Sequence, residues 1–200
     1  MSIKVQGLGS TGTASTALIT ISGSTNATPI VVTFAAGHGL KDFDRIAVAG
    51  ITGNTNANGE WSLQFTGANT ARLLGSVGNG THGGTPRVAV INDVTPAMKG
   101  HSAELCTFGN LSAGAVTFEA YESYADFAAG VNTAGAVPPV QSPTGGVWTQ
   151  AAGSGSAPAS SAFTGAATNV GISCEVRLPR YMRAVLGASS TGTIGAVIKA

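Results

Sequence analysis

The residues of this chain that could do chemistry are few, and their spacing matches none of the common catalytic or metal-binding motifs. There are three histidines, His38, His82 and His101, and each lies beside a glycine, in a position typical of turns. None is paired at the spacing that places two metal ligands on one helical face. No serine lies in a Gly-x-Ser-x-Gly turn between a strand and a helix. The sequence therefore predicts no catalytic residue, no metal site and no cofactor.

An acidic pair and two cysteines leave alternatives open. Asp42 and Asp44 could share one calcium ion, but carboxylates with basic neighbours on either side are more typical of a solvated turn. Cys106 and Cys174 fall in separate predicted strands, where reduced thiols commonly pack as small apolar side chains. A disulfide between them stays open, because the sequence does not fix their distance. Two distant cysteines are too few for a zinc site.

The clearest cluster of charged and aromatic residues lies near the C-terminus and comprises Arg177, Arg180, Tyr181 and Arg183. Arg and Tyr are enriched at protein interfaces, because each can bury an apolar body and still satisfy a polar tip. We predict a protein interface here, with a solvated face and a nucleic-acid or saccharide site as alternatives. Trp148, in a stretch rich in Gly, Ala and Ser, is a further interface candidate because it could anchor that stretch on a neighbour.

The composition argues against several classes of protein. Charged residues make up 10% of the chain, against about 25% in typical globular proteins. The 29 glycines and the many Ser, Thr and Ala residues favour an all-β protein with many turns. A formal net charge of +1 gives no strong field to attract a phosphate backbone, so nucleic acid is not expected as a partner.

No targeting or membrane segment is expected. The first residues, MSIKVQG, lack the charged and apolar regions of a signal peptide. No apolar run approaches the roughly 18 residues that a spanning helix needs. We therefore expect a protein made and assembled in the cytoplasm, with no membrane partner.

The pattern along the chain predicts three parts. Residues 1–16 are rich in Gly, Ser and Thr, and we expect an extended arm, disordered in isolation, that uses apolar Ile3 and Val5 to bind a neighbouring subunit. Residues 17–92 form a small β-barrel-like module, and the turn residues at 92–96 mark its boundary. The predicted strands of the module cover residues 17–21, 29–34, 46–51, 61–65, 71–74 and 87–91.

Residues 93–200 are expected to form a β-sandwich or jelly-roll-like domain. Strands are predicted at 103–108, 115–121, 172–178, 181–187 and 193–199, with a turn at 109–114. Residues 125–169 are expected to be a long loop, ordered by function or by a partner. Around its start, residues 124–129, followed by Gly130, are expected to form one or two turns of helix.

The first module is similar to a known family. The stretches GHGLKDFDRIAVAG (37–50) and NGEWSLQF (58–65) resemble a small β-module that recurs in tailed-phage virion proteins. That module is often labelled after the first catalytic cysteine half-domain of ubiquitin-activating enzyme, with which it shares a small barrel. The resemblance covers about residues 17–92 and implies a virion component. No adenylation or thioester residues accompany it here, so it implies no enzyme activity.

The second part also has a resemblance. The turn at 109–114 before VTFE (116–119), followed by LPRYMRAV (178–185), resembles the β-sandwich of phage head cement and decoration proteins. This resemblance implies that the basic, aromatic segment pairs with the closing strand of the chain. The polar signature that the family carries after the strand of Glu119 is missing, which leaves both a cement fold and a tail sandwich open.

Together these observations predict a structural protein of a bacteriophage virion. The first expectation is a capsid decoration or cement protein, a homotrimer that stabilises the lattice of the major capsid protein by non-covalent contacts. A tail or fibre protein is the alternative. A carbohydrate-binding module for host attachment is a second alternative, with Tyr121, Tyr124 and Trp148 as its candidate aromatic residues.

Overall fold

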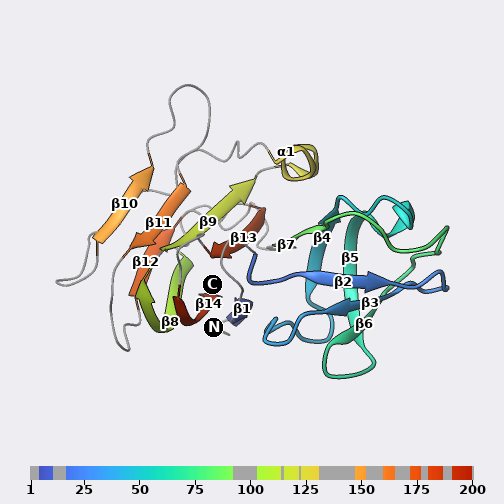
Figure 1. Ribbon diagram of the computed structural model, residues 1–200, viewed down its shortest axis with the longest axis horizontal. Coiled ribbons are helices and arrows are strands. Elements are labelled where there is room, and N and C mark those ends of the chain that lie inside the picture. Colours follow the sequence, from blue (N-terminus) through green and yellow to red (C-terminus); the bar gives the residue numbers. More distant parts are fainter. Residues whose placement is uncertain are drawn as a thin grey trace.

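The chain is mostly β (Figure 1), as the alternation of apolar residues predicts. The computed structural model describes the backbone of residues 5–10, 17–91, 103–113, 115–121, 123–130, 147–151, 160–164, 172–176, 180–186 and 191–199, and the side chains of 17–91, 119, 121, 123–130 and 180–185. Within these ranges the helices are α1 (Tyr124–Ala129) and the short 3-10 helix η1 (Thr55–Ala57). In that part of the chain, no helix has the length and apolar character needed to cross a membrane.

Seven strands form one antiparallel curled sheet, a half-barrel, in the order β13-β7-β4-β5-β6-β3-β2. Their bounds are β2 (Ile21–Ser24), β3 (Val31–Phe34), β4 (Arg45–Ala49), β5 (Gly59–Phe65), β6 (Thr70–Leu73), β7 (Arg87–Ile91) and β13 (Tyr181–Leu186). The six strands from the first part of the chain lie within a few residues of their predicted positions. The seventh, β13, comes from the distant C-terminal part and pairs with β7 at Tyr181↔Ile91 and Met182↔Val90.

Alternate positions of these strands fill the inside of the curl with apolar side chains. Ile46 of β4 lies opposite Val90 of β7 on one side and opposite Trp61 of β5 on the other. β-Branched and aromatic side chains suit such a pleated, buried surface. The buried residues on this face include Ile30, Val32, Phe34, Ile46, Val48, Leu63, Leu73, Val88, Val90 and Met182.

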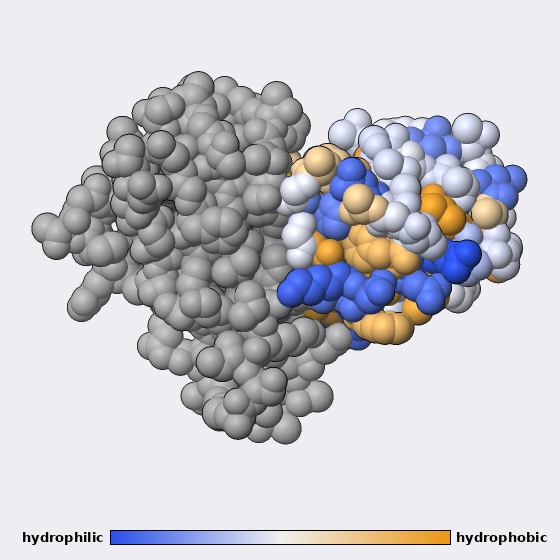
Figure 2. Space-filling model, turned by 90° about the horizontal axis from the view of Figure 1, so that it is seen from below, coloured by the Kyte–Doolittle hydropathy of each residue, from blue (hydrophilic) through white to orange (hydrophobic). Residues whose placement is uncertain are grey.

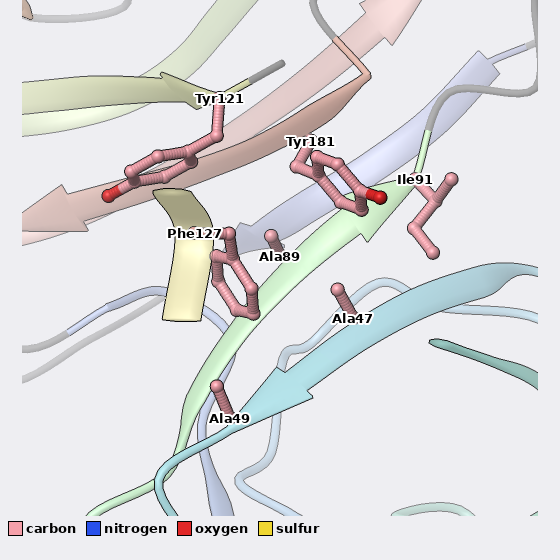
Figure 3. Packing of buried hydrophobic residues seen from close by; sticks show 7 residues of the cluster. All are labelled: Ala47, Ala49, Ala89, Ile91, Tyr121, Phe127 and Tyr181. Atoms are coloured by element: carbon pink, nitrogen blue, oxygen red, sulfur yellow. The ribbon is translucent and has the colours of Figure 1, made fainter. Parts of the chain in front are cut away.

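The outer face of β4 and β7 is buried as well, because α1 lies across it. Phe127 of α1 stacks on the ring of Tyr181 at a centroid distance of 6.2 Å and meets Tyr121 edge-on at 5.6 Å. Alanines on the underlying strands leave room for the Phe127 ring. The cluster comprises Ala47, Ala49, Ala89, Ile91, Tyr121, Phe127 and Tyr181 (Figure 3).

Local signals in the sequence set the ends of α1. Ser123 is its N-cap, and the Ser123 hydroxyl accepts a hydrogen bond of 3.1 Å from the backbone N–H of Asp126. Gly130 ends the helix in the left-handed conformation, with φ of 72°. The predicted short helix is therefore confirmed.

The curled sheet brings its two edges together at one point. Ala17, just before β2, forms an isolated antiparallel bridge with Val185 of β13. The backbone N–H of Leu18 donates to the carbonyl oxygen of Ala184 at 2.8 Å. Strand β13 therefore contacts both ends of the first module.

A second sheet has the strand order β1-β14-β8-β12, and three further strands extend the first sheet from β13 in the order β9-β11-β10 (Figure 1). The bounds are β1 (Val5–Ser10), β8 (Ala103–Ala113), β9 (Ala115–Tyr121), β10 (Val147–Ala151), β11 (Ser160–Thr164), β12 (Ile172–Val176) and β14 (Thr191–Lys199). The resemblance to cement proteins implied that the last two strands pair with each other. Instead β13 pairs with β7 and β9, and β14 pairs with β1 and β8.

Three other expectations change. Val5–Ser10 was expected in a disordered arm, but it forms β1 and pairs with the chain's own β14. The predicted turn at 109–114 is largely strand, because β8 continues to Ala113 alongside β14. The predicted loop at 125–169 carries, besides the expected helix α1, a hairpin of β10 and β11. In each case pairing with a distant or Gly-rich segment supplies hydrogen bonds that the local pattern does not predict.

The predicted domain boundary at 92–96 and residues 1–4 of the predicted N-terminal arm lie outside the described residues. Cys106 in β8 lies opposite Ser173 of β12, so it is one position out of register with Cys174.

Candidate functional site

Three of the predicted interface residues lie together on β13 or directly before it. Arg180, Tyr181 and Arg183 meet two glutamates from other strands. Val5 lies in β1 and Trp148 in β10, at positions where only the backbone is described. Arg177 and Ile3 lie outside the described residues.

Glu60 of β5 forms the first half of this polar cluster. Its carboxylate accepts hydrogen bonds from Arg180 at 2.9 Å, from Arg45 at 3.1 Å and from the Tyr181 hydroxyl at 2.5 Å. Burial raises the pKa of Glu60, but the hydrogen bonds from Tyr181 and Arg180 and the charges of Arg180 and Arg45 outweigh that effect and lower it. Glu60 is therefore held in its charged form, and it ties the start of β13 to β4 and β5.

Glu119 of β9 forms the second half. Its Oε2 atom lies 3.4 Å from Nη2 of Arg87 and 3.2 Å from Nε of Arg183, and it accepts a hydrogen bond from the Tyr121 hydroxyl. Burial, followed by the hydrogen bond to Glu119, raises the pKa of Tyr121. Burial also lowers the pKa of Arg183, against the attraction of Glu119. Arg87 and Arg183 therefore share the carboxylate of Glu119, which is only partly exposed to water.

The contacts of Arg180, Tyr181 and Arg183 described above are all made with other residues of the same chain. Tyr181 is 2% exposed and stacks on Phe127, and the side chain of Arg183 is 13% exposed. Of these three residues, Arg180 has the most exposed side chain, at 51%. The cluster therefore holds the strands of the fold together, and Arg180 is the part of it that a second protein could reach.

His38 lies in a loop, as expected, but it is buried. Its Nδ1 atom accepts from the backbone N–H of Leu40 at 3.0 Å, so its Nε2 atom is the donor to the carbonyl oxygen of Ala68 at 3.1 Å. The ring also stacks on Phe65 with a centroid distance of 5.1 Å and an interplanar angle of 4°. Both ring nitrogens are occupied, so His38 has a structural role and is not available to a metal.

His82 lies near the hydroxyl of Ser24. The sequence pattern did not predict this contact. Nδ1 of His82 lies 3.1 Å from the hydroxyl of Ser24, which also accepts from the buried amide of Asn54 at 3.3 Å. A nucleophilic serine needs a base that is oriented by a third group. Among the described residues, no carboxylate bonds to the other ring nitrogen of His82. The contact joins two loops, and no signal in the local sequence could have predicted it, because 58 positions separate the two residues.

The carboxylates of Asp42 and Asp44 are occupied by backbone donors. Asp42 accepts from the N–H of Phe65, and Asp44 accepts from the N–H of Lys41 at 2.9 Å. Over the described side chains, no group of three or more His, Cys, Asp or Glu residues could hold a metal ion. Both carboxylates thus bind backbone N–H groups around this turn.

The aromatic residues considered for carbohydrate binding are largely packed inside the fold. Tyr121 is 1% exposed, and half-buried Tyr124 donates its hydroxyl hydrogen to the carbonyl oxygen of Val48 at 2.7 Å. Trp61, which is not one of these candidates, is half-buried, and its indole N–H donates to the carbonyl oxygen of Ala57 at 2.9 Å. For Trp148, the third candidate, the structure describes only the backbone, which pairs with Phe163 of β11.

Comparison with known proteins adds no relative: no protein-family model, no curated protein and no solved structure matches the chain significantly.

Proposed function

We propose that this chain is a structural component of a bacteriophage virion, a decoration or cement protein on the outside of the major capsid lattice. The observation that carries the proposal is the resemblance of residues 17–92 to the small β-module of phage virion proteins. That resemblance implies a small barrel, and this part of the chain forms most of a curled antiparallel sheet. The protein is assembled in the host cytoplasm and acts in the virion.

The distribution of charge supports an adhesive role. Arg45, Arg87, Arg180 and Arg183 are all engaged by Glu60 or Glu119. On the face shown in Figure 2, hydrophilic and hydrophobic residues lie side by side on the described surface, and the formal net charge of the chain is only +1. Such a surface suits many modest contacts with another protein better than it suits a nucleic acid.

The second part of the chain is proposed to be a β-sandwich of the cement type. Its strands β8, β12 and β14 belong to one antiparallel sheet together with β1, and β9, β11 and β10 continue the antiparallel sheet that contains β13. In the proposed sandwich these two sheets pack face to face. We further propose a homotrimer, because closed symmetry would cover strand edges that otherwise invite uncontrolled pairing.

The mechanism follows from mass action. A protein that binds the assembled lattice better than free subunits stabilises the assembled form. Many copies of a rigid β-body, each bound through non-covalent contacts, would then strengthen a shell against internal pressure. No covalent step and no cofactor is required.

The copy number of the chain in purified virions tests this proposal. A decoration protein should be present in hundreds of copies, measured by quantitative gel staining against the major capsid protein. A handful of copies would instead indicate a tail or fibre protein, where the same β-modules occur. Absence from the virion would contradict the proposal altogether.

A further inference from the structure

Two Asn-Gly pairs occur in the chain, Asn58-Gly59 and Asn79-Gly80. Such a dipeptide can modify itself, because the backbone nitrogen of the glycine can attack the side-chain amide carbon of the asparagine. Glycine favours this reaction, since it has no Cβ to obstruct the closing ring. The dipeptide is the same in both places, so a difference in reactivity between the two pairs has to come from their structural surroundings.

Asn58-Gly59 is locked by its surroundings. The Asn58 side chain accepts from the backbone N–H of Ile51 at 2.9 Å and donates to the carbonyl oxygen of the same residue at 2.8 Å. Asn58 is only partly exposed, and Gly59 begins β5 opposite Val48 of β4. Attack by the glycine nitrogen would require the side chain to leave both hydrogen bonds and the start of β5 to open.

Asn79-Gly80 lies in the loop between β6 and β7, where the restraints are weaker. Asn79 is exposed, and within the described part of the chain the N–H of Gly80 donates to no other residue. The Oδ1 atom of Asn79 accepts from the backbone N–H of Asn56 at 3.0 Å, and its Nδ2 atom donates to the Thr55 hydroxyl at 2.7 Å. Both hydrogen bonds are open to water, so they hold the side chain only modestly. The donor on Oδ1 also stabilises the negative charge that forms there during attack.

We propose that Asn79-Gly80 is a site of spontaneous deamidation in the folded protein, and that Asn58-Gly59 is protected from the same reaction. The Gly80 nitrogen loses its proton and bonds to the amide carbon of Asn79. The bond from that carbon to Nδ2 breaks, so ammonia leaves and a cyclic imide remains. Water then opens the ring at either carbonyl, which gives aspartate or isoaspartate. The reaction consumes only water, and it does not depend on the proposed function.

The two products should affect the fold differently. Aspartate leaves the main chain unchanged and keeps an oxygen that can accept from the N–H of Asn56. Isoaspartate lengthens the main chain beside two tight contacts. The N–H of Asn79 donates to Oδ1 of fully buried Asn54 at 3.0 Å, and a Cβ on Gly80 would lie only 2.4 Å from the carbonyl oxygen of Gly53. Isoaspartate, unlike aspartate, should therefore loosen this loop.

Peptide mapping of the native chain tests the site and needs no substitution. The folded protein is incubated at mildly alkaline pH and physiological temperature, digested, and analysed by mass spectrometry for conversion of each asparagine. Asn79 should convert about tenfold or more faster than Asn58, and the two rates should become similar when the chain is unfolded in urea. Equal rates in the folded chain, faster conversion of Asn58, or no conversion of Asn79 would overturn the proposal. A difference that persists unchanged in urea would overturn it as well, because the fold would then not be the cause.

Substitutions at position 79 separate the two products. The native chain should gain an acidic band in isoelectric focusing, because each event adds a negative charge to a chain whose formal net charge is only +1. Its melting temperature should fall as isoaspartate accumulates. Asn79→Ser, which has no amide to lose, should gain no such band in the same time, and freshly prepared Asn79→Asp should melt close to the fresh native chain. Equally fast acidification of Asn79→Ser would place the reaction elsewhere and overturn the site. Fresh Asn79→Asp that melts as low as the aged native chain would overturn the effect assigned to isoaspartate.

Discussion

The hydroxyl of Tyr181 donates a hydrogen bond to the carboxylate of Glu60, although the two residues lie 121 positions apart in the chain. Arg180 binds the same carboxylate at 2.9 Å. Because Tyr181 also packs against Phe127 beneath α1, strand β13 joins the first module through both polar and apolar contacts. The C-terminal part of the chain is therefore needed to complete the sheet built by residues 17–91.

Glu60→Gln should lower the free energy of unfolding by about 1 kcal/mol, since it removes the negative charge to which Arg180, Arg45 and the Tyr181 hydroxyl donate, at a site partly open to water. Urea unfolding at neutral pH measures this loss. Lys41→Gln, which removes an exposed charge from a turn, is the control and should change stability much less. An equal effect of the two substitutions would show that the Glu60 cluster adds nothing specific.

The same residue should make stability depend on pH in acid. The pKa of Glu60 in the folded chain lies below its ordinary value of 4.5. Its contribution is therefore complete above about pH 4.5 and is lost as the pH falls through the folded value. The stability of Glu60→Gln should vary less with pH in this window than that of the native chain, and parallel pH profiles would contradict the assignment.

All three tyrosines of the chain should ionise late. Burial raises the pKa of Tyr121, Tyr124 and Tyr181, the last to about 12, from an ordinary value of 10.0. The ultraviolet absorbance of tyrosinate should therefore be weak in the folded protein at pH 10, whereas the urea-unfolded chain should be about half ionised. A raised folded pKa gives stability that is complete below pH 10 and is lost as the pH rises through the folded value. Equal titration of the folded and unfolded chains would contradict this packing.

Met182→Ala should destabilise the whole first module. Met182 is fully buried in β13 opposite Val90 of β7, so its truncation leaves a cavity inside the curl. The expected loss is about 2–4 kcal/mol, measured by chemical denaturation with Trp61 fluorescence as the probe. Met182→Leu, which nearly conserves volume, should cost less than about 1.5 kcal/mol. If Met182→Ala leaves the module's transition unchanged, β13 is not part of its core.

Deletion of residues 1–10 should also lower stability, although the segment is poor in apolar residues. It removes β1 and leaves the edge of β14 without its backbone partners. The expected signs are a lower melting temperature and faster hydrogen exchange in β14 than in β4, which serves as an internal reference. An unchanged melting temperature would restore the interpretation of this segment as an arm that orders only against a neighbour.

The sequence predicted the strands of the first module well, because they carry a strong local signal. The alternation of Trp61, Leu63 and Phe65 marks β5, and Arg87–Ile91 is β7 as predicted. The short helix α1 was also predictable from Ser123 and Gly130, which cap its two ends.

What the sequence missed depends on contacts between distant residues. The alternation in Tyr181–Leu186 predicts a strand. It does not predict which strands are its partners, which are β7 and β9 instead of β14. Val5–Ser10 has too much glycine for a local strand signal, and its pairing comes from β14. The candidate site shows the same limit, because the glutamates that engage Arg180 and Arg183 lie far away in the sequence.

The measurement that tests the central claim most directly is the binding of the purified chain to capsids that lack it. We predict saturable binding, with hundreds of copies on each capsid, and a higher temperature of capsid disruption once the sites are filled. Sedimentation with the capsids gives the copy number, and a thermal scan of the same samples gives the stabilisation. Failure to co-sediment, or saturation at a few copies with no change in capsid stability, would contradict the assignment as a decoration protein.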